Sequence, residues 1–218
     1  MDASFWNKRW EERQIGFHQR RINEYLQTYW PTLALPQGAP VFVPLCGKSL
    51  DMLWLADQGH SVIGVELAEQ AINDFLTENQ LDAERCESDR FITFDLERIR
   101  LLCGDFFKLT ADDTADVAGF YDRAALIALP AEMRQRYVAH LTELMRPGTQ
   151  GLLIALEYPQ HQKDGPPFCV PDEEVRGLFE RGWTVEWIRE DDMLHRNERF
   201  RDAGVAHLIE RVYRLTRH

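Results

Sequence analysis

The sequence lacks the features of a membrane protein, a nucleic-acid-binding protein or a secreted protein. No apolar run approaches the ~20 residues of a membrane-spanning helix, and the first residues are charged instead of forming an apolar signal segment. With 25 Lys+Arg against 36 Asp+Glu, the net charge is −11. A general nucleic-acid or anionic-membrane surface needs a basic face. We therefore expect a cytoplasmic protein without a nucleic-acid or membrane partner.

Patterns that would indicate a disulfide framework or a metal site are also missing. The four cysteines lie far apart in the chain and form no C-x-x-C pair. The seven histidines show no ligand spacing such as H-E-x-x-H. The sequence therefore predicts reduced thiols, which suit the cytosol, and no bound metal. The thiols are those of Cys46, Cys86, Cys103 and Cys169.

Residues 41–66 have the pattern of a βαβ unit. An apolar run at 41–45 predicts a strand buried on both faces, and residues 46–48 form the turn that follows. Ser49 can cap the next helix, which Gly59 ends. Residues 62–65 predict a second buried strand with Glu66 at its carboxyl end. In open α/β sheets, ligands bind outside the carboxyl ends of the strands.

The dinucleotide fingerprint is absent from this unit, because the turn holds Gly47 alone and no G-x-G-x-x-G. A pyrophosphate needs close approach to the backbone through several glycines. An adenosine ligand without a pyrophosphate fits better, and S-adenosylmethionine is the obvious one. Glu66 could accept hydrogen bonds from its two ribose hydroxyls. The alternative is an incidental surface glutamate after an ordinary turn.

The remaining pattern predicts an α/β fold with five parallel strands followed by an antiparallel pair. Right-handed crossovers put strands two and three on one side of the first strand and strands four and five on the other. Residues 81–97 read as an irregular insertion, perhaps with a short hairpin. We expect one domain over residues 1–218, with residues 1–35 as a helical cover. The later strands are expected at residues 99–103, 118–122, 151–157, 184–188 and 206–215.

Several side chains fall near the expected ligand edge, each with an ordinary alternative. Trp6 and Trp10 share a helix face, which indicates either core packing or an indole over a ligand pocket. Asp105 follows the third strand, either in a simple Gly-Asp turn or at an adenine edge. Asp122 and Arg123 end the fourth strand and could form a surface ion pair.

Five further motifs make the chain similar to the thiopurine S-methyltransferase family in its shorter bacterial form, nearly from end to end. They are FWNKRW at 5–10 with GFHQ at 16–19, VPLCGK at 43–48, GHSVIGVE at 59–66, YDRAAL at 121–126, and GPPF at 165–168 with VP at 170–171. The resemblance implies a single-domain, Rossmann-like, seven-stranded methyltransferase sheet with helices on both faces.

The resemblance also implies the site residues. Those expected to contact S-adenosylmethionine are Trp10, Leu45, Glu66, Arg123, Asp105 and Phe106. Those expected to face the acceptor are Phe17, Arg123 and Arg199. The resemblance assigns no residue role within the 81–97 insertion. The family acts on thiopurines and on selenium or tellurium species, so it implies a small-molecule thiol, selenol or tellurium acceptor and a detoxification role, and we expect a monomer.

The chemistry needs no strong base, because a heteroaromatic thiol is largely a thiolate near neutrality. We find no Ser-His-Asp or Cys-His arrangement and assign no catalytic acid, base or nucleophile; Cys46 reads as structural. Arg123 and Arg199 could lower the pKa of the acceptor thiol. Two alternatives are a non-catalytic S-adenosylmethionine sensor and a nicotinamide-dependent oxidoreductase. The missing glycine fingerprint argues against the oxidoreductase.

Overall fold

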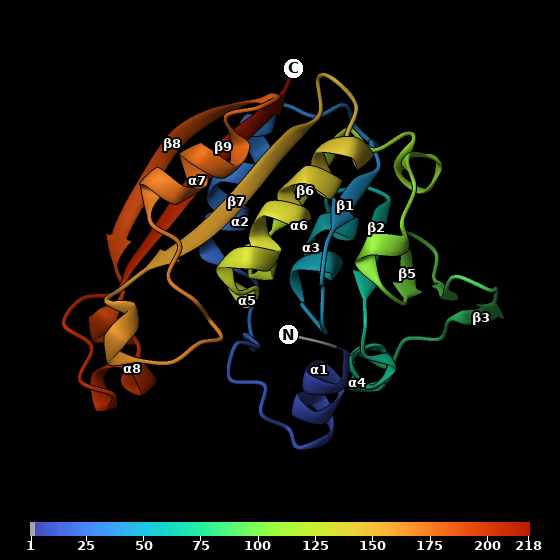
Figure 1. Ribbon diagram of the computed structural model, residues 1–218. Coiled ribbons are helices and arrows are strands. Elements are labelled where there is room, and N and C mark those ends of the chain that lie inside the picture. The colour runs from blue at the N-terminus through green and yellow to red at the C-terminus, as the bar shows by residue number, and fades with distance from the viewer. Residues whose placement is uncertain (1–2) are drawn as a thin grey trace. The chain divides into compact units, whose positions relative to one another are not determined.

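The computed structural model describes residues 3–218 (Figure 1). The chain divides into two compact units, Met1–Tyr121 and Asp122–His218. Whether the two form the single domain expected from the sequence stays a prediction.

Unit one contains six strands and four helices within its described residues. The strands are β1 (Val41–Val43), β2 (Val62–Glu66), β3 (Glu84–Glu87), β4 (Ile92–Asp95), β5 (Ile99–Cys103) and β6 (Gly119–Asp122), the last of which ends one residue beyond the unit. The helices are α1 (Ala3–Glu11), α2 (Glu24–Tyr29), α3 (Asp51–Asp57) and α4 (Glu69–Glu78). Short 3-10 turns cover Trp30–Leu33, Phe106–Lys108 and Ala111–Thr114.

The strand order in unit one is β3-β4-β5-β2-β1-β6. Strands β5, β2, β1 and β6 run parallel, whereas β3, β4 and β5 are joined antiparallel. The order of the four parallel strands confirms the crossovers expected from the sequence. Their carboxyl ends therefore meet at one edge, where β2 ends in Glu66 and β5 ends in Cys103 opposite it.

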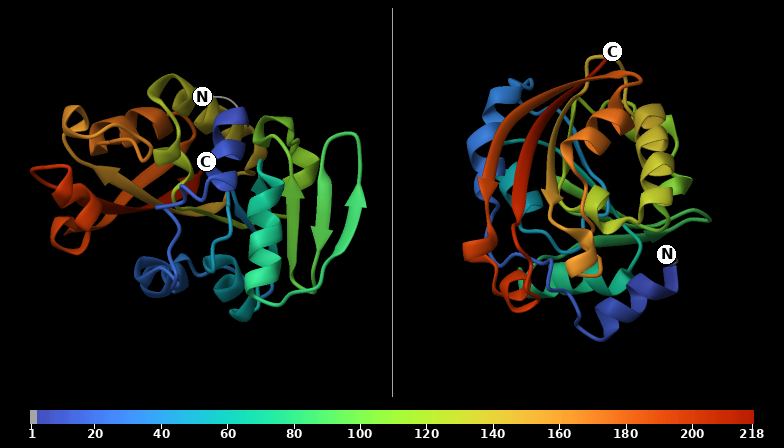
Figure 2. Two further views of the ribbon diagram at one scale, coloured as in Figure 1. Left: turned by 90° about the horizontal axis from the view of Figure 1, so that it is seen from below. Right: turned by 60° about the vertical axis from the view of Figure 1, so that its left-hand side comes forward.

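The β3–β4 hairpin (green in Figure 2) corrects the expected strand number, because the described residues contain nine strands instead of seven. All four residues of β3 are exposed, so the segment carries no apolar alternation to mark a strand. Hydrogen bonding to β4, which itself pairs with β5, supplies the order that the sequence pattern does not show.

The N-terminal segment is tied to the rest of unit one by buried polar contacts. Asn23 accepts hydrogen bonds from the N–H groups of Tyr25 and Leu26 and so caps α2, which begins at residue 24. The buried Asp51 accepts from the Asn23 N–H at 2.8 Å and from the Tyr121 hydroxyl at 2.9 Å. Helix α1 packs against α4.

Unit two contains four helices and three strands. They are α5 (Ala125–Ala128), α6 (Ala131–Leu144), β7 (Gln150–Glu157), α7 (Asp172–Phe179), β8 (Trp183–Asp192), α8 (Glu198–Asp202) and β9 (Ile209–Arg217), with short 3-10 turns at Gln160–Gln162 and Leu194–Arg196. The strand order is β7-β9-β8, antiparallel throughout, as expected for the last strands. Strand β8 runs four residues beyond the strand expected at residues 184–188, into a polar stretch.

Within residues 3–218, no helix combines the length and apolar character needed to cross a membrane. All four cysteines are free. The part of the chain that the structure describes holds no cluster of His, Cys, Asp and Glu suited to a metal ion.

Candidate active site

The turn after β1 is a tight backbone loop at the carboxyl edge of unit one. Leu45 and Gly47 both have left-handed backbones, with φ of 46° and 54°, and these end β1 two residues earlier than the sequence suggested. The Cys46 N–H donates to the carbonyl of Val65 at 2.9 Å. The turn is thereby held against the end of β2, with the Gly47 amide directed to Glu66.

Glu66 joins this turn to the start of the next helical segment. One carboxylate oxygen accepts the Gly47 N–H at 2.8 Å, and the other accepts the Ala68 N–H at 2.9 Å. The side chain is 7% exposed, and burial raises its pKa, although hydrogen bonds from backbone amides oppose the rise. A carboxylate offers about four lone-pair positions. Glu66 can therefore accept further hydrogen bonds at the edge while holding both backbone segments.

Trp10 covers the same two backbone segments. Its indole lies so close to the turn that a Cβ built on Gly47 would be 3.2 Å from Trp10 Cζ2. It packs with Ala68 and Ala71 and is 3% exposed. The indole is therefore packed in the core. The backbone that it packs on is the turn and the segment held by Glu66.

Phe17 lies in an aromatic group with the tryptophans of α1. Its ring meets Trp10 edge-on at a centroid distance of 5.7 Å and Trp6 at 6.0 Å. It is only partly buried. The structure thus brings Phe17 next to the proposed cofactor cover, which sequence spacing did not reveal.

Asp105 and Phe106 follow β5 at the same edge. The Gly104 N–H donates to the backbone carbonyl of Glu66 at 2.9 Å, so this corner lies beside the end of β2. Asp105 is exposed, and its carboxylate accepts the Phe107 N–H at 2.9 Å. Phe106 is buried and stacks on Phe42 with a centroid distance of 6.3 Å. Asp105 can accept hydrogen bonds from a ligand. The ring of Phe106 belongs to the core, so this residue presents mainly its backbone at the edge.

Cys46 sits in the turn but is a poor nucleophile. Its side chain is 4% exposed, and burial, followed by the charge of Glu66, raises the pKa of the thiol well above its ordinary value. A thiol in that state is protonated near neutral pH. The structural role expected from the sequence agrees with this burial.

The sequence did not reveal that Lys48 anchors the turn to α4. Its ammonium lies 2.6 Å from a Glu78 oxygen and 3.7 Å from an Asp74 oxygen, and its side chain is 4% exposed. The i, i+4 spacing of the two acids on one helix was the available signal, but nothing in the sequence identified the cation that they face.

In unit two, Arg123 and Asp122 have different environments. Asp122 is fully buried at the end of β6 and accepts from the N–H groups of Ala125 and Leu126 and from the Tyr137 hydroxyl. Arg123 is half-buried and close enough to Glu210 to affect its titration. Burial raises the pKa of Glu210, and the charge of Arg123 opposes that rise. The sequence had not indicated Glu210.

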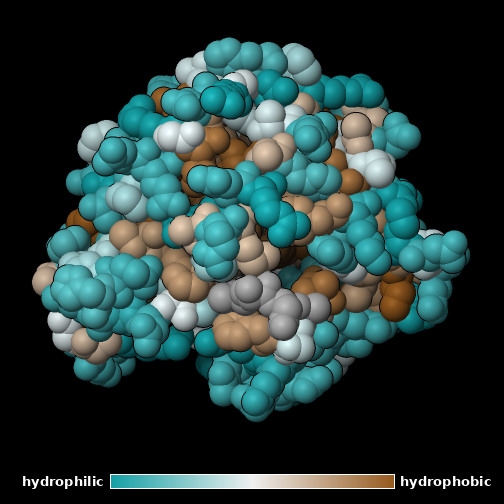
Figure 3. Space-filling model, viewed as in Figure 1, coloured by the Kyte–Doolittle hydropathy of each residue, from teal (hydrophilic) through white to brown (hydrophobic). Residues whose placement is uncertain are grey.

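Arg199 lies exposed on α8. The surface over α8, at the lower left of the view, is largely hydrophilic (Figure 3). The next residue, Phe200, is buried and meets Tyr158 edge-on at 5.1 Å. The Ala206 N–H also donates to the Gln162 side chain at 2.8 Å. These contacts join α8 to the Pro/Gly-rich loop at residues 158–171.

The structure therefore brings Trp10, Phe17, Leu45 and Glu66 together and places Asp105 and Phe106 at the neighbouring strand end. Arg123 and Arg199 belong to the other unit. The binding roles of all eight residues remain predictions.

Comparison with known proteins decides the family. The family model described as thiopurine S-methyltransferase matches residues 1–218. The chain belongs to this family. It is 53% identical over 217 residues to a thiopurine S-methyltransferase of Pseudomonas fluorescens strain Pf-5, covering 100% of this chain and 98% of the relative. A thiopurine S-methyltransferase of Azotobacter vinelandii is 50% identical, with 100% of both chains covered.

Solved structures support the same fold at low sequence identity. An S-adenosylmethionine-dependent methyltransferase from Anabaena variabilis gives a TM-score of 0.69 at 14% identity, covering 99% of this chain and 95% of that one. The 1,6-didemethyltoxoflavin-N1-methyltransferase of Burkholderia thailandensis, solved with S-adenosylhomocysteine, gives 0.63 at 18%, covering 98% and 87%. The protein is therefore an S-adenosylmethionine-dependent methyltransferase with an α/β fold. Membership of this family excludes the sensor and oxidoreductase alternatives.

Proposed function

We propose that this enzyme methylates the sulfur of aromatic or heterocyclic thiols, thiopurines among them, with S-adenosylmethionine held at the carboxyl edge of unit one. The observation that carries the proposal is the Glu66 carboxylate, which bridges the Gly47 and Ala68 amides directly beneath the Trp10 indole. When bound, S-adenosylmethionine supplies an activated methyl group on a sulfonium sulfur.

The residues at the edge fit this cofactor. Glu66 has lone pairs left for two ribose hydroxyls, and the exposed Asp105 can accept a hydrogen bond from the amino group of an adenine. Leu45, which forms part of the left-handed turn, and Trp10, which packs on it, are the apolar residues proposed to contact the cofactor. Arg123, half-buried in unit two, completes the proposed set.

For the acceptor, we assign Phe17, Arg123 and Arg199. An aromatic ring suits a flat heterocycle, and a guanidinium favours a thiolate over the neutral thiol, which lowers the pKa of the acceptor. This local cation matters because the chain carries a net charge of −11. The protein's part in the reaction is then to align the acceptor sulfur and exclude water, with no side chain acting as a base.

The acceptors of the enzyme extend, in this proposal, beyond thiols. Selenols are more acidic than thiols, so a site that selects anions suits them, and tellurium species belong to the same proposal. We propose a single-domain monomer that works in the cytoplasm, where its four free cysteines stay reduced.

A turnover assay with S-adenosylmethionine and an aromatic thiol tests the proposal, with Arg199→Ala as the diagnostic variant. We expect wild-type turnover, and about a fivefold to tenfold rise in the acceptor KM for Arg199→Ala, since one charge-assisted contact to the thiolate is lost. Arg181→Ala, which removes an exposed cation from the turn after α7, is the control and should leave KM unchanged.

Two results would count against parts of this account. Absence of methyl transfer to any thiol would refute the function itself. Unchanged acceptor kinetics and pH dependence in Arg199→Ala would leave the electrostatic role to Arg123 alone.

A further inference from the structure

The β3–β4 hairpin reaches the ligand edge of unit one. Residue Ile92, which begins β4, pairs with Cys103, which ends β5. The hairpin loop, residues 88–91, therefore lies at the carboxyl end of β5, next to the corner that holds Asp105. This is the segment to which no family feature could be assigned from the sequence.

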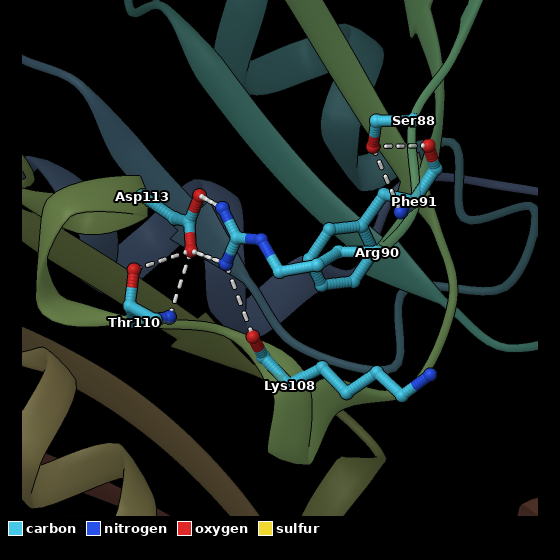
Figure 4. A network of polar contacts seen from close by, with 6 residues as sticks. All are labelled: Ser88, Arg90, Phe91, Lys108, Thr110 and Asp113. Carbon is cyan, nitrogen blue, oxygen red and sulfur yellow. Dashed lines mark hydrogen bonds and ion pairs between the residues drawn. The ribbon is translucent and has the colours of Figure 1, made fainter.

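The loop has a fixed conformation of its own. The Ser88 hydroxyl accepts the Phe91 N–H at 3.1 Å and donates to the Phe91 carbonyl at 2.8 Å, while the Ser88 N–H donates to the same carbonyl at 2.9 Å (Figure 4). These bonds hold Arg90 and Phe91 on one short turn from which both side chains reach the segment after β5.

Phe91 packs on the first residue of that segment. Its side chain is 5% exposed, and a Cβ built on Gly104 would lie 2.6 Å from its ring and 3.0 Å from the Arg90 carbonyl. Only glycine leaves room for the loop at this point. Gly104 also donates to the Glu66 carbonyl, so Phe91 rests on the backbone that connects the two strand ends.

Arg90 holds the far end of the same segment. Its guanidinium donates to both oxygens of Asp113, at 2.8 and 2.9 Å, and to the carbonyl of Lys108 at 3.2 Å (Figure 4). Asp113 also accepts from the N–H and the hydroxyl of Thr110. Burial would raise the pKa of Asp113, but the hydrogen bonds from Arg90 and Thr110 outweigh it and lower that pKa.

Residues 104–113 depend on this support because they contain only two short 3-10 turns. The loop fixes the segment at Gly104, at Lys108 and at Asp113, and Asp105 and Phe106 lie between these points. We propose that Arg90 and Phe91 are positioning residues that hold the adenine side of the cofactor site, acting through residues 104–113. This inference rests on the proposed function, since it assumes that Asp105 faces the adenine.

The test compares Arg90→Ala with Arg90→Lys and with the control Arg85→Ala. Arg85 lies on β3 of the same hairpin and pairs with Glu69 and Glu87 at 3.4 Å, and neither of these partners belongs to residues 104–113. Calorimetry should measure binding of S-adenosylhomocysteine and of S-inosylhomocysteine, in which a carbonyl replaces the 6-amino donor. Steady-state kinetics and thermal unfolding of the same samples complete the set.

We expect Arg90→Ala to bind S-adenosylhomocysteine about tenfold more weakly, to raise KM for S-adenosylmethionine with little change in kcat, and to lose most of the preference for adenine over hypoxanthine. Arg90→Lys should recover part of the affinity, because the charge remains while the planar fork is lost. Arg85→Ala should behave as the wild type.

Three results separate this inference from its alternatives. If Arg90→Ala unfolds at a lower temperature but keeps both affinity and base preference, Arg90 only stabilises the fold and the inference is wrong. If Arg90→Ala matches the wild type in every measurement, it is also wrong, while the proposed function stands. If the wild type itself binds no S-adenosylhomocysteine, the proposed function fails first. Should Arg90→Ala not fold, Asp113→Asn removes the same ion pair and gives the same readouts.

Discussion

Two buried carboxylates, one in each unit, lie at the carboxyl ends of parallel strands but have different roles. Glu66 closes β2 in unit one, and Asp122 closes β6 at the start of unit two. Each accepts two backbone N–H groups, and burial raises the pKa of each. From the sequence alone, both were acids at a strand end on the expected ligand edge.

The difference lies in how many of their lone pairs the protein itself uses. Asp122 is fully buried, takes both N–H groups on one oxygen and the Tyr137 hydroxyl at 2.7 Å on the other. Glu66 keeps 7% exposure and holds one amide on each oxygen, from two separate segments. An acid at a strand end is therefore a ligand candidate when its partners leave acceptor capacity at the surface, and a structural cap when they do not.

The largest expected effect is the loss of stability in Asp122→Ala. The substitution leaves three buried donors without an acceptor, so we expect the free energy of unfolding to fall by about 3–4 kcal/mol at pH 5. Denaturant unfolding measures this, with Tyr137→Phe as a smaller matched change of about 1 kcal/mol. A loss below 1 kcal/mol in Asp122→Ala would mean that Asp122 is not the cap described here.

A smaller effect concerns the pH dependence of stability. Burial raises the pKa of Asp122 to about 6, above its ordinary 3.8, so the folded state binds the proton more tightly than the unfolded state. Its contribution to stability is full below pH 4 and is lost as pH rises through 6. A rise of about two units corresponds to about 2–3 kcal/mol.

Asp122→Asn should remove this loss, so the difference in unfolding free energy between variant and wild type should shift in favour of the variant between pH 4 and 7. Glu66 is present in both proteins, so its own raised pKa cancels in the comparison. A difference that stays constant over this range would show that Asp122 titrates normally and is not buried as described.

The sequence predicted the order of the parallel strands and the residues at their ends, because buried strands and glycine-ended helices have strong local patterns. It suggested a short hairpin within residues 81–97 but did not count its strands in the sheet, because β3 is polar and exposed on all four residues. Nor did it extend β8 through residues 189–192, where charges such as Glu190, paired with Arg211 on β9, replace an apolar alternation.

The candidate site shows the same limit. Helical spacing indicated that Trp10 shares a face with Trp6, but not that this face rests on Gly47 and Ala68. The acid at Glu66 could be singled out, yet its bridge between two amides depends on a left-handed turn formed by Leu45 and Gly47. Contacts of this kind join segments distant in the chain and leave no periodic signal.

The most direct test of the central claim is calorimetric titration of S-adenosylhomocysteine into Glu66→Gln and Asp122→Asn side by side, with thermal unfolding to verify that both are folded. If Glu66 is the ligand carboxylate and Asp122 the structural one, Glu66→Gln should bind about tenfold or more weakly, because charged hydrogen bonds to the ligand are lost, while Asp122→Asn should stay within about twofold of the wild type. An unchanged dissociation constant for Glu66→Gln, or an equal loss in both variants, would contradict the account.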